Sequence, residues 1–141
     1  MGGTESFADD ASGDGSVVVG QSRDGGQFWK AFRWTAATGM RDIGTLGGPM
    51  AAAYNVSDNG SVIVGRALTS SNSASDRAFR WTAQKGMENL RSVLQGLGVT
   101  GVNGWILLGA TGVSADGTVI VGEGINPAKE REAFRAVVPL P

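Results

Sequence analysis

The sequence predicts an all-β fold built from three four-stranded antiparallel repeat units. The first observation is a nine-residue phrase that occurs three times, because self-similarity at such a spacing is typical of repeat architectures. The second is an Asp-Gly or Asn-Gly dipeptide in each copy, the strongest short signal for a hairpin turn. The third is composition, since 23 glycines and only 4 prolines in 141 residues suit many tight turns between short strands. The copies are Ser12-Gly-Asp-Gly-Ser-Val-Val-Val-Gly20, Ser57-Asp-Asn-Gly-Ser-Val-Ile-Val-Gly65 and Ser114-Ala-Asp-Gly-Thr-Val-Ile-Val-Gly122.

Each unit is expected to contain four strands, and the first of them precedes the turn, as in Tyr54–Ser57 and Thr111–Ser114. The second is the apolar run after the turn, and a continuous apolar run is typical of a strand buried on both faces. The third is the Ala-Phe-Arg-Trp phrase, whose alternation puts Phe and Trp on one face and Arg on the other. The fourth begins with Gly-Met, at 39–43 and 86–90. The residues expected to be buried are Val17–Val19, Val62–Val64, Val119–Val121, Phe32, Phe79, Phe134, Trp34 and Trp81.

The turn dipeptides predict type I′ geometry, in which both central residues have positive φ. The pairs concerned are Asp14-Gly15, Asn59-Gly60 and Asp116-Gly117. These acidic positions could also suggest calcium ligands. Because Asn59 takes the place of aspartate in the second copy, and asparagine serves a turn without carrying charge, we expect turn geometry and no metal.

One segment departs from the repeat and predicts a short helix near residues 89–97. Asn89 is a suitable N-cap, Gly98 is a suitable stop, and the segment 105–108 after it indicates a lengthened strand. The apolar residues of the helix follow a helical period at Leu90, Val93, Leu94 and Leu97.

We expect residues 1–141 to form a single repeat domain with units at about 7–48, 51–98 and 105–139. Four short strands per unit favour β-propeller blades, and a β-trefoil or a threefold β-prism remains an open alternative. Propellers close with about 4 to 8 blades. Three units therefore predict a homo-oligomer, most simply a dimer, or a fragment of a longer propeller.

Composition excludes several classes of function. A net charge of −1 and a pI near 5.3 give no basic surface for nucleic acid. No stretch approaches the roughly 20 apolar residues of a membrane helix, and the N-terminus lacks the pattern of a signal peptide. With no cysteine and no histidine, thiolate chemistry and the common catalytic triads are excluded. We expect no cofactor and no enzymatic activity.

Two sets of residues are candidates for ligand binding. Phe28 and Trp29 lie in a polar segment, residues 21–30, that has no aromatic pair in the other units. They predict either an aromatic platform for a ligand or packing over a neighbouring unit. The repeated arginines predict either guanidinium groups that face an anionic ligand or structural pairs with acidic neighbours. They are Arg33, Arg80 and Arg135.

The paired phrases, from about residue 8 to residue 139, resemble the bacterial extracellular HAF-repeat family, named for a His-Ala-Phe tripeptide. The resemblance implies an exported protein, secreted, periplasmic or at the cell surface, with propeller-like repeats and no established reaction. The histidine position holds Lys30, Arg77 and Glu132 here, so a histidine-dependent role is excluded.

We therefore expect a non-catalytic extracellular binding module, with a glycan or cell-surface polymer as ligand. The loops 21–30, 66–77 and 123–132 would carry recognition, because variable loops on a rigid scaffold are the usual place for it. The alternative is a structural module that associates with itself or docks a partner protein.

Overall fold

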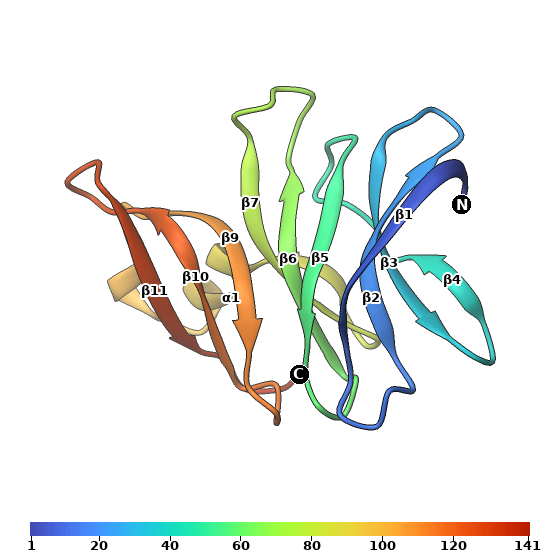
Figure 1. The fold of residues 1–141 in the computed structure, drawn as a ribbon. Helices are drawn as coiled ribbons and strands as arrows, with labels where there is room; N and C mark the ends of the chain where they lie inside the picture. Colours follow the sequence, from blue (N-terminus) through green and yellow to red (C-terminus); the bar gives the residue numbers. More distant parts are fainter.

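In a computed structural model that describes residues 1–141, the chain forms three separate antiparallel sheets, which we call A, B and C (Figure 1). Each sheet is a simple meander in which consecutive strands are neighbours. Sheet A contains β1 (Gly2–Ala11), β2 (Val18–Asp24), β3 (Trp29–Thr35) and β4 (Gly39–Asp42). Sheet B contains β5 (Ala51–Val56), β6 (Val62–Leu68), β7 (Asp76–Thr82) and β8 (Gly86–Asn89). Sheet C contains β9 (Ile106–Val113), β10 (Val119–Ile125) and β11 (Arg131–Val137).

The all-β expectation is confirmed, but the third unit has three strands instead of four. The residues after β11 contain no Gly-Met phrase; Pro139 and Pro141 lack a backbone N–H, and the Val138 N–H donates to the Thr118 carbonyl just before β10. The first unit begins at Gly2, earlier than the predicted residue 7, because β1 pairs with β2 along its whole length.

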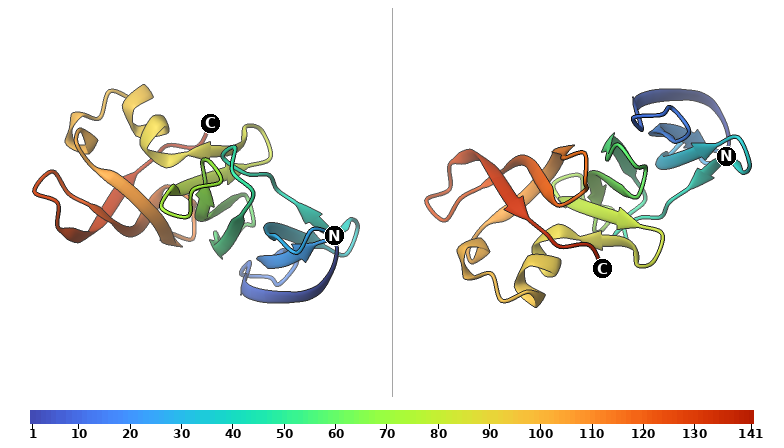
Figure 2. Two further views of the ribbon diagram at one scale, coloured as in Figure 1. Left: turned by 90° about the horizontal axis from the view of Figure 1, so that it is seen from above. Right: turned by 90° about the horizontal axis from the view of Figure 1, so that it is seen from below.

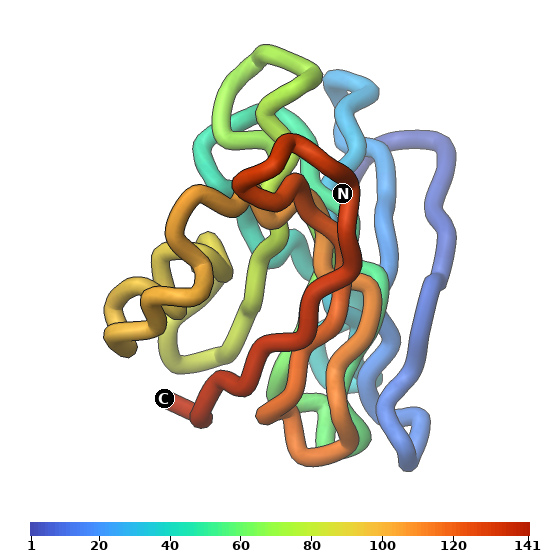
Figure 3. The backbone as a smooth tube through the Cα atoms, turned by 90° about the vertical axis from the view of Figure 1, so that its left-hand side faces the viewer, coloured from blue at the N-terminus to red at the C-terminus, as the bar shows by residue number.

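The predicted helix is confirmed as α1 (Leu90–Gly96). The Asn89 side chain caps it by accepting hydrogen bonds from the N–H groups of Arg91 and Ser92, and Gly98 ends it with a φ of +77°. A 3-10 turn, η1 (Thr100–Val102), follows, and the predicted lengthened strand is the first half of β9. Figure 3 shows α1 and η1 to one side of the sheets and β1 at the opposite side. No helix is both long enough and apolar enough to cross a membrane.

The three sheets follow one another in a row, with B in the middle (Figure 2). The first strand of each unit packs on the preceding sheet: β5 lies against β1, β2 and β3, and β9 lies against β5, β6 and β7. The same packing relation is therefore used twice. The threefold closure expected for a trefoil or prism would bring A and C together, whereas the main contacts between sheets run only from A to B and from B to C.

The predicted core is confirmed in the middle sheet, except that Trp81 is only partly buried, and it is partly wrong in the outer two. Ile63 and its neighbours in β6 are fully buried, but Trp34 is 37% exposed and Val121 is 42% exposed. Val18, Val119 and Phe134 are partly exposed. The reason is positional, because A and C each have a neighbouring sheet on only one face. The two apolar clusters that join the sheets centre on Ile63 and Phe79 between A and B, and on Val64 and Ile120 between B and C.

The repeated turns differ from the predicted type I′ geometry. Gly15, Gly60 and Gly117 have φ values of +72°, +72° and +80°, as expected. The Asp and Asn residues before them do not have positive φ, so that part of the prediction is wrong. Their side chains instead organise the loop: Asp14 Oδ1 accepts hydrogen bonds from the Ser12 hydroxyl and from the Ser16 N–H, both at 2.9 Å. The other two turns repeat these bonds.

The turns also hydrogen-bond to one another along the row. The Gly13 N–H donates to the Asp58 carbonyl (2.9 Å), and the Asp58 N–H donates to the Ala115 carbonyl (3.1 Å). These three residues occupy the same place in the three turns. A second set of bonds runs through Asn55, which donates to the Asp10 carboxylate and accepts from the Val113 N–H at 2.8 Å.

Candidate ligand-binding site

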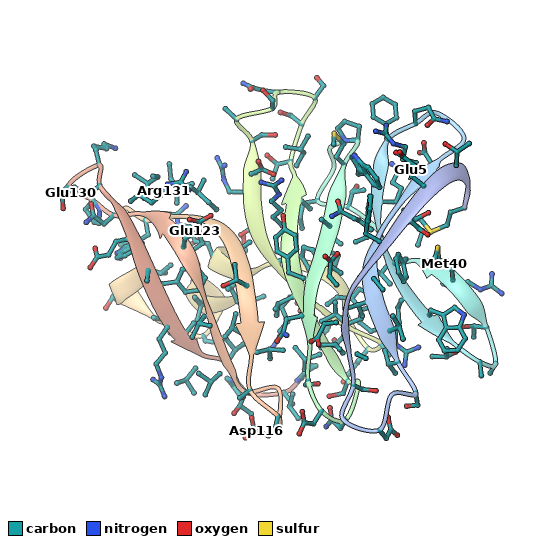
Figure 4. All side chains as sticks on the ribbon, viewed as in Figure 1. Glu5, Met40, Asp116, Glu123, Glu130 and Arg131 are labelled. Atoms are coloured by element: carbon teal, nitrogen blue, oxygen red, sulfur yellow. The ribbon has the colours of Figure 1, made fainter.

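The loops between the second and third strands of each unit gather at one end of the row, which we call the rim (Figure 1). The β2, β6 and β10 strands extend further than the sequence suggested, so the loops are shorter, at 25–28, 69–75 and 126–130. Figure 4 shows Glu123, Glu130 and Arg131 at this rim and Asp116 at the opposite end with the repeated turns. The rim therefore holds the variable segments, whereas the other end holds the constant ones.

Trp29 is the centre of an aromatic cluster on the rim of sheet A. Its ring lies 5.6 Å from the ring of Phe7 on β1, at an interplanar angle of 42°. The guanidinium of Arg23 lies over the Trp29 ring, 4.5 Å from its centre. The Glu5 carboxylate (2.7 Å) and the Gln27 carbonyl (2.9 Å) hold this arginine in place. Contrary to expectation, Trp29 begins strand β3, so the strand ladder fixes the position of its ring.

Phe28 projects from the loop beside this cluster and is exposed. The Asp24 carboxylate shapes the loop by accepting hydrogen bonds from the N–H groups of Gly26 (2.8 Å) and Phe28 (2.9 Å). The Phe28 hydrogen bond is the largest of the effects that lower the pKa of Asp24 below its usual value. The Lys30 ammonium lies 5.9 Å from the centre of the Phe28 ring and donates to the Pro49 carbonyl at 2.7 Å.

A shallow pocket of about 390 Å³ opens next to Trp29, between sheets A and B. Trp29 forms one wall, and polar groups from both sheets complete it, among them Gln21, Arg66, Ser73 and Asp76. A second pocket, of about 310 Å³, lies in the corresponding place between B and C. Arg66 and Asp76 line both pockets. The rim thus carries two adjacent grooves that share one wall.

The second groove is charged where the first is aromatic. Arg66 and Asp76 approach to 3.8 Å, and Arg131 and Glu123 to 2.9 Å, so the same two strand positions carry ion pairs of opposite polarity in sheets B and C. Tyr54 lies between them, under the Arg66 guanidinium at 5.9 Å. Burial is the main effect that raises the pKa of Tyr54 above its usual value, so its hydroxyl is a neutral hydrogen-bonding group at physiological pH.

The three repeated arginines do not lie with the aromatic cluster. Arg33 lies between sheets A and B, with its guanidinium 5.9 Å from the centre of the Trp81 ring. Arg80 is 4% exposed and donates to Glu88 (2.8 Å) and to the Pro139 carbonyl (3.0 Å). Only Arg135 is exposed. They follow the row of sheets from A to C without forming a ring around a common ligand.

Sequence reasoning missed Phe7 and Arg23. Phe7 corresponds to Ala52 and Gly109 in the other units, so it is an aromatic residue outside the repeat pattern, in the same way as Phe28 and Trp29. That departure was the available signal. Pairing of Phe7 with Gln21 brings it beside Trp29, and only the β1–β2 register reveals this.

A third and more apolar pocket, of about 520 Å³, lies along the free edge of β11. Trp105, Phe134 and Val102 line it. The corresponding edge of β7 is paired with β8, so this pocket occupies the region where the other sheets have their fourth strand.

No protein-family model, no curated protein and no solved structure matches this chain.

Proposed function

We propose that this protein is a non-catalytic binding module that holds a glycan or a cell-surface polymer along its rim. The aromatic cluster at Trp29 carries the proposal, because a tryptophan fixed by a strand and flanked by a pocket is suited to stack on the apolar face of a sugar ring. Gln21, Ser73 and Asp76 in the same pocket supply donors and acceptors for sugar hydroxyl groups.

The acidic residues of the rim support binding in preference to catalysis. Glu5, Asp24, Asp76 and Glu123 each face a basic partner within 4 Å. A glycosidase requires one carboxyl with a raised pKa to act as an acid beside a second, ionised carboxylate. The pKa of Asp24 is lowered instead, and Asp9, whose pKa is raised by burial, lines neither groove of the rim. The carboxylates of the rim are therefore suited to structural pairing and to hydrogen bonding with a ligand.

We also propose that the three units are successive blades of a β-propeller. The repeated packing of β5 on sheet A and of β9 on sheet B supports this, since a constant relation between neighbouring units is what a closed ring requires. On this view the protein is an exported member of the HAF-repeat family, as its phrases suggest.

A glycan array probed with the purified chain tests the binding proposal. We expect wild-type protein to bind a subset of glycans, and Trp29→Ala and Phe7→Ala to lower the affinity by about tenfold or more, the loss expected for one aromatic contact. Trp105→Ala is the matched control, because Trp105 lines the pocket at β11 and neither of the two rim grooves, and this variant should bind normally. An array on which the wild type binds nothing, or on which Trp29→Ala binds equally well, would overturn the proposal.

A further inference from the structure

We propose that the two end faces of the row bind each other between two copies of this chain, with sheet C of one copy packed on sheet A of the other. The inference does not depend on glycan binding, because it concerns the outer faces of sheets A and C and not the rim. It rests on the fact that both end faces are repeats of surfaces already packed inside the chain.

Each unit uses the same side chains to meet the unit that follows. In sheet A these are Val17, Val19 and Ala31, and in sheet B they are Val62, Val64 and Ala78. Sheet C has nothing packed on this face and presents the equivalent residues to solvent, with Val121 42% exposed. They are Val119, Val121 and Ala133.

Each unit likewise uses a second set of side chains to meet the unit that precedes it. In sheet B these include Ile63, Phe79, Trp81 and Met87, which pack in the cluster against sheet A. Sheet A has the equivalent residues on its other face, where Trp34 is 37% exposed and Met40 lies directly opposite it in the β3–β4 ladder. The free face of A is therefore the counterpart of the free face of C. The equivalent residues are Val18, Phe32, Trp34 and Met40, of which Phe32 is already buried within the chain at 2% exposed.

The row of hydrogen bonds between the turns leaves a free N–H donor at one end and a free carbonyl acceptor at the other. The bonds run in one direction, from the N–H of one unit to the carbonyl of the next, through Gly13, Asp58 and Ala115. The Ala115 N–H has no acceptor within the chain, and the Gly13 carbonyl has no donor. Gly60 and Gly117 are covered by Val17 and Val62 of the preceding units, whereas nothing lies near Gly15. A second copy placed after sheet C would join the free donor to the free acceptor and cover Gly15 with Val119.

The arginine–tryptophan contact between sheets A and B has equivalent residues on the two end faces, where they have no partner within the chain. Arg33 stacks over Trp81 of the following sheet. Arg135 and Trp34 occupy the equivalent positions on the two end faces, and both are exposed. In the assembly, Arg135 of one copy would stack over Trp34 of the other, a contact that is more favourable once it is desolvated.

The repeat sets the number of copies, if the units are propeller blades. Propellers close with about 4 to 8 blades, and six is the only multiple of three in that range, so two copies complete a ring with two identical C-to-A interfaces. One hydrogen bond is missing at these interfaces. Inside the chain, the side chains of Asp10 and Asn55 accept a hydrogen bond from a backbone N–H of the following unit. Gly112 occupies the equivalent position in the third unit and has no side chain to accept one. We therefore expect a dimer that dissociates on dilution.

Sedimentation velocity of the full chain at about 50 µM, well above the dissociation constant of a specific interface, tests the inference. We expect a dimer for the wild type and monomers for Trp34→Asp and Val121→Asp, each of which blocks one end. An equimolar mixture of these two variants keeps one intact face from each partner and should recover a heterodimer. Leu97→Asp changes an exposed apolar residue outside both end faces and should leave the dimer intact. A monomeric wild type, open-ended growth, or dimers lost in only one of the two variants would overturn the proposal.

Disulfide trapping gives an independent measurement, because the chain has no cysteine of its own. A mixture of Gly13→Cys and Ala115→Cys chains should form a cross-linked heterodimer under mild oxidation, and neither chain should cross-link efficiently alone. The intrachain pair Gly13→Cys with Asp58→Cys is the positive control, since a Cβ at Gly13 would lie 3.3 Å from the Asp58 Cβ, close to disulfide spacing. A control that closes while the mixture stays uncross-linked would exclude the C-to-A contact.

Discussion

Gly65 lies directly opposite Phe79 in the β6–β7 ladder, and the ring of Phe79 covers it. A Cβ at Gly65 would meet the Ala52 carbonyl oxygen at 2.0 Å and the Phe79 ring at 2.9 Å. The same relation joins Gly20 to Phe32 and Gly122 to Phe134. The two repeated phrases are therefore one structural device, in which the last glycine of the first phrase makes room for the Phe of the second.

Gly65→Ala should destabilise the protein by several kcal/mol, because its methyl group cannot be placed without moving the β5 backbone. Chemical denaturation followed by circular dichroism measures the effect. Gly96→Ala is the matched control: Gly96 ends helix α1 with open space around it, so the same change should be neutral or stabilise by about 0.5–1 kcal/mol. Similar midpoints for the two variants would contradict the packing described for Gly65.

Truncation of the central residue of each apolar run should cost most in the middle sheet. Ile63 is 0% exposed, so Ile63→Ala should destabilise by about 2–5 kcal/mol, and Ile63→Asp should prevent folding because it buries an unpaired charge. Val18→Ala, at the equivalent but partly exposed position of sheet A, should cost clearly less. Thermal melts of the two alanine variants test the order. The melts are run at low protein concentration, where the proposed dimer has dissociated, and an equal loss of stability there would contradict the exposed outer face of sheet A.

The repeat in the sequence was sufficient to place nearly every strand, because spacing and period 2 define strand ends and faces. It could not show whether a face is covered: Trp34 and Trp81 occupy the same place in the repeat, yet only the second is packed by a neighbouring sheet. Nor could it separate the roles of the arginines. Arg80 faces Glu88 in the next strand, whereas Arg33 faces Arg41, and this difference decides whether a salt bridge forms.

The turn geometry shows a second limit of sequence reasoning. Asp-Gly fits type I′ well, but the serine two residues earlier, at Ser12, Ser57 and Ser114, provides an alternative. Its hydroxyl accepts the N–H of the residue that starts the apolar run and donates to the Asp or Asn, which stabilises a turn with only one left-handed residue. A side chain thus replaces the backbone preference on which the type I′ prediction depended.

Arg80→Lys should destabilise the protein although it keeps the charge. Two different nitrogens of the guanidinium donate to Glu88 and to the Pro139 carbonyl. Lysine ends in a single ammonium nitrogen, which cannot make both hydrogen bonds with the same geometry. We expect a loss of about 1–3 kcal/mol, typical of a buried charged hydrogen bond left incomplete. Arg131→Lys is the control, since its pair with Glu123 is exposed and should change stability by under about 0.5 kcal/mol. Urea denaturation distinguishes them, and equal effects would contradict the structural role of Arg80.

The stability of the protein should fall in acid partly through two of its three turns. Hydrogen bonds from the Ser16 N–H and the Ser114 hydroxyl are the largest effects that lower the pKa of Asp14 and of Asp116, each from 3.8 to about 2. A carboxyl whose pKa is lower in the folded state stabilises the fold above its unfolded pKa, and this contribution is lost as the pH falls towards its folded pKa. The loss should therefore occur between about pH 4 and about pH 2.

The double variant Asp14→Asn, Asp116→Asn tests this, because asparagine already holds the corresponding turn at Asn59 with the same hydrogen bonds and no titrating group. Its unfolding free energy should change less with pH over that window than the wild-type value does. Asn59→Asp should do the opposite, since it adds a third carboxylate that the turn keeps ionised. Denaturation midpoints measured from about pH 4 down to about pH 2 give the comparison. If all three proteins follow parallel curves, the turn carboxylates do not contribute to acid sensitivity, and the hydrogen bonds at Asp14 and Asp116 are no stronger in the folded chain than those that water supplies in the unfolded one.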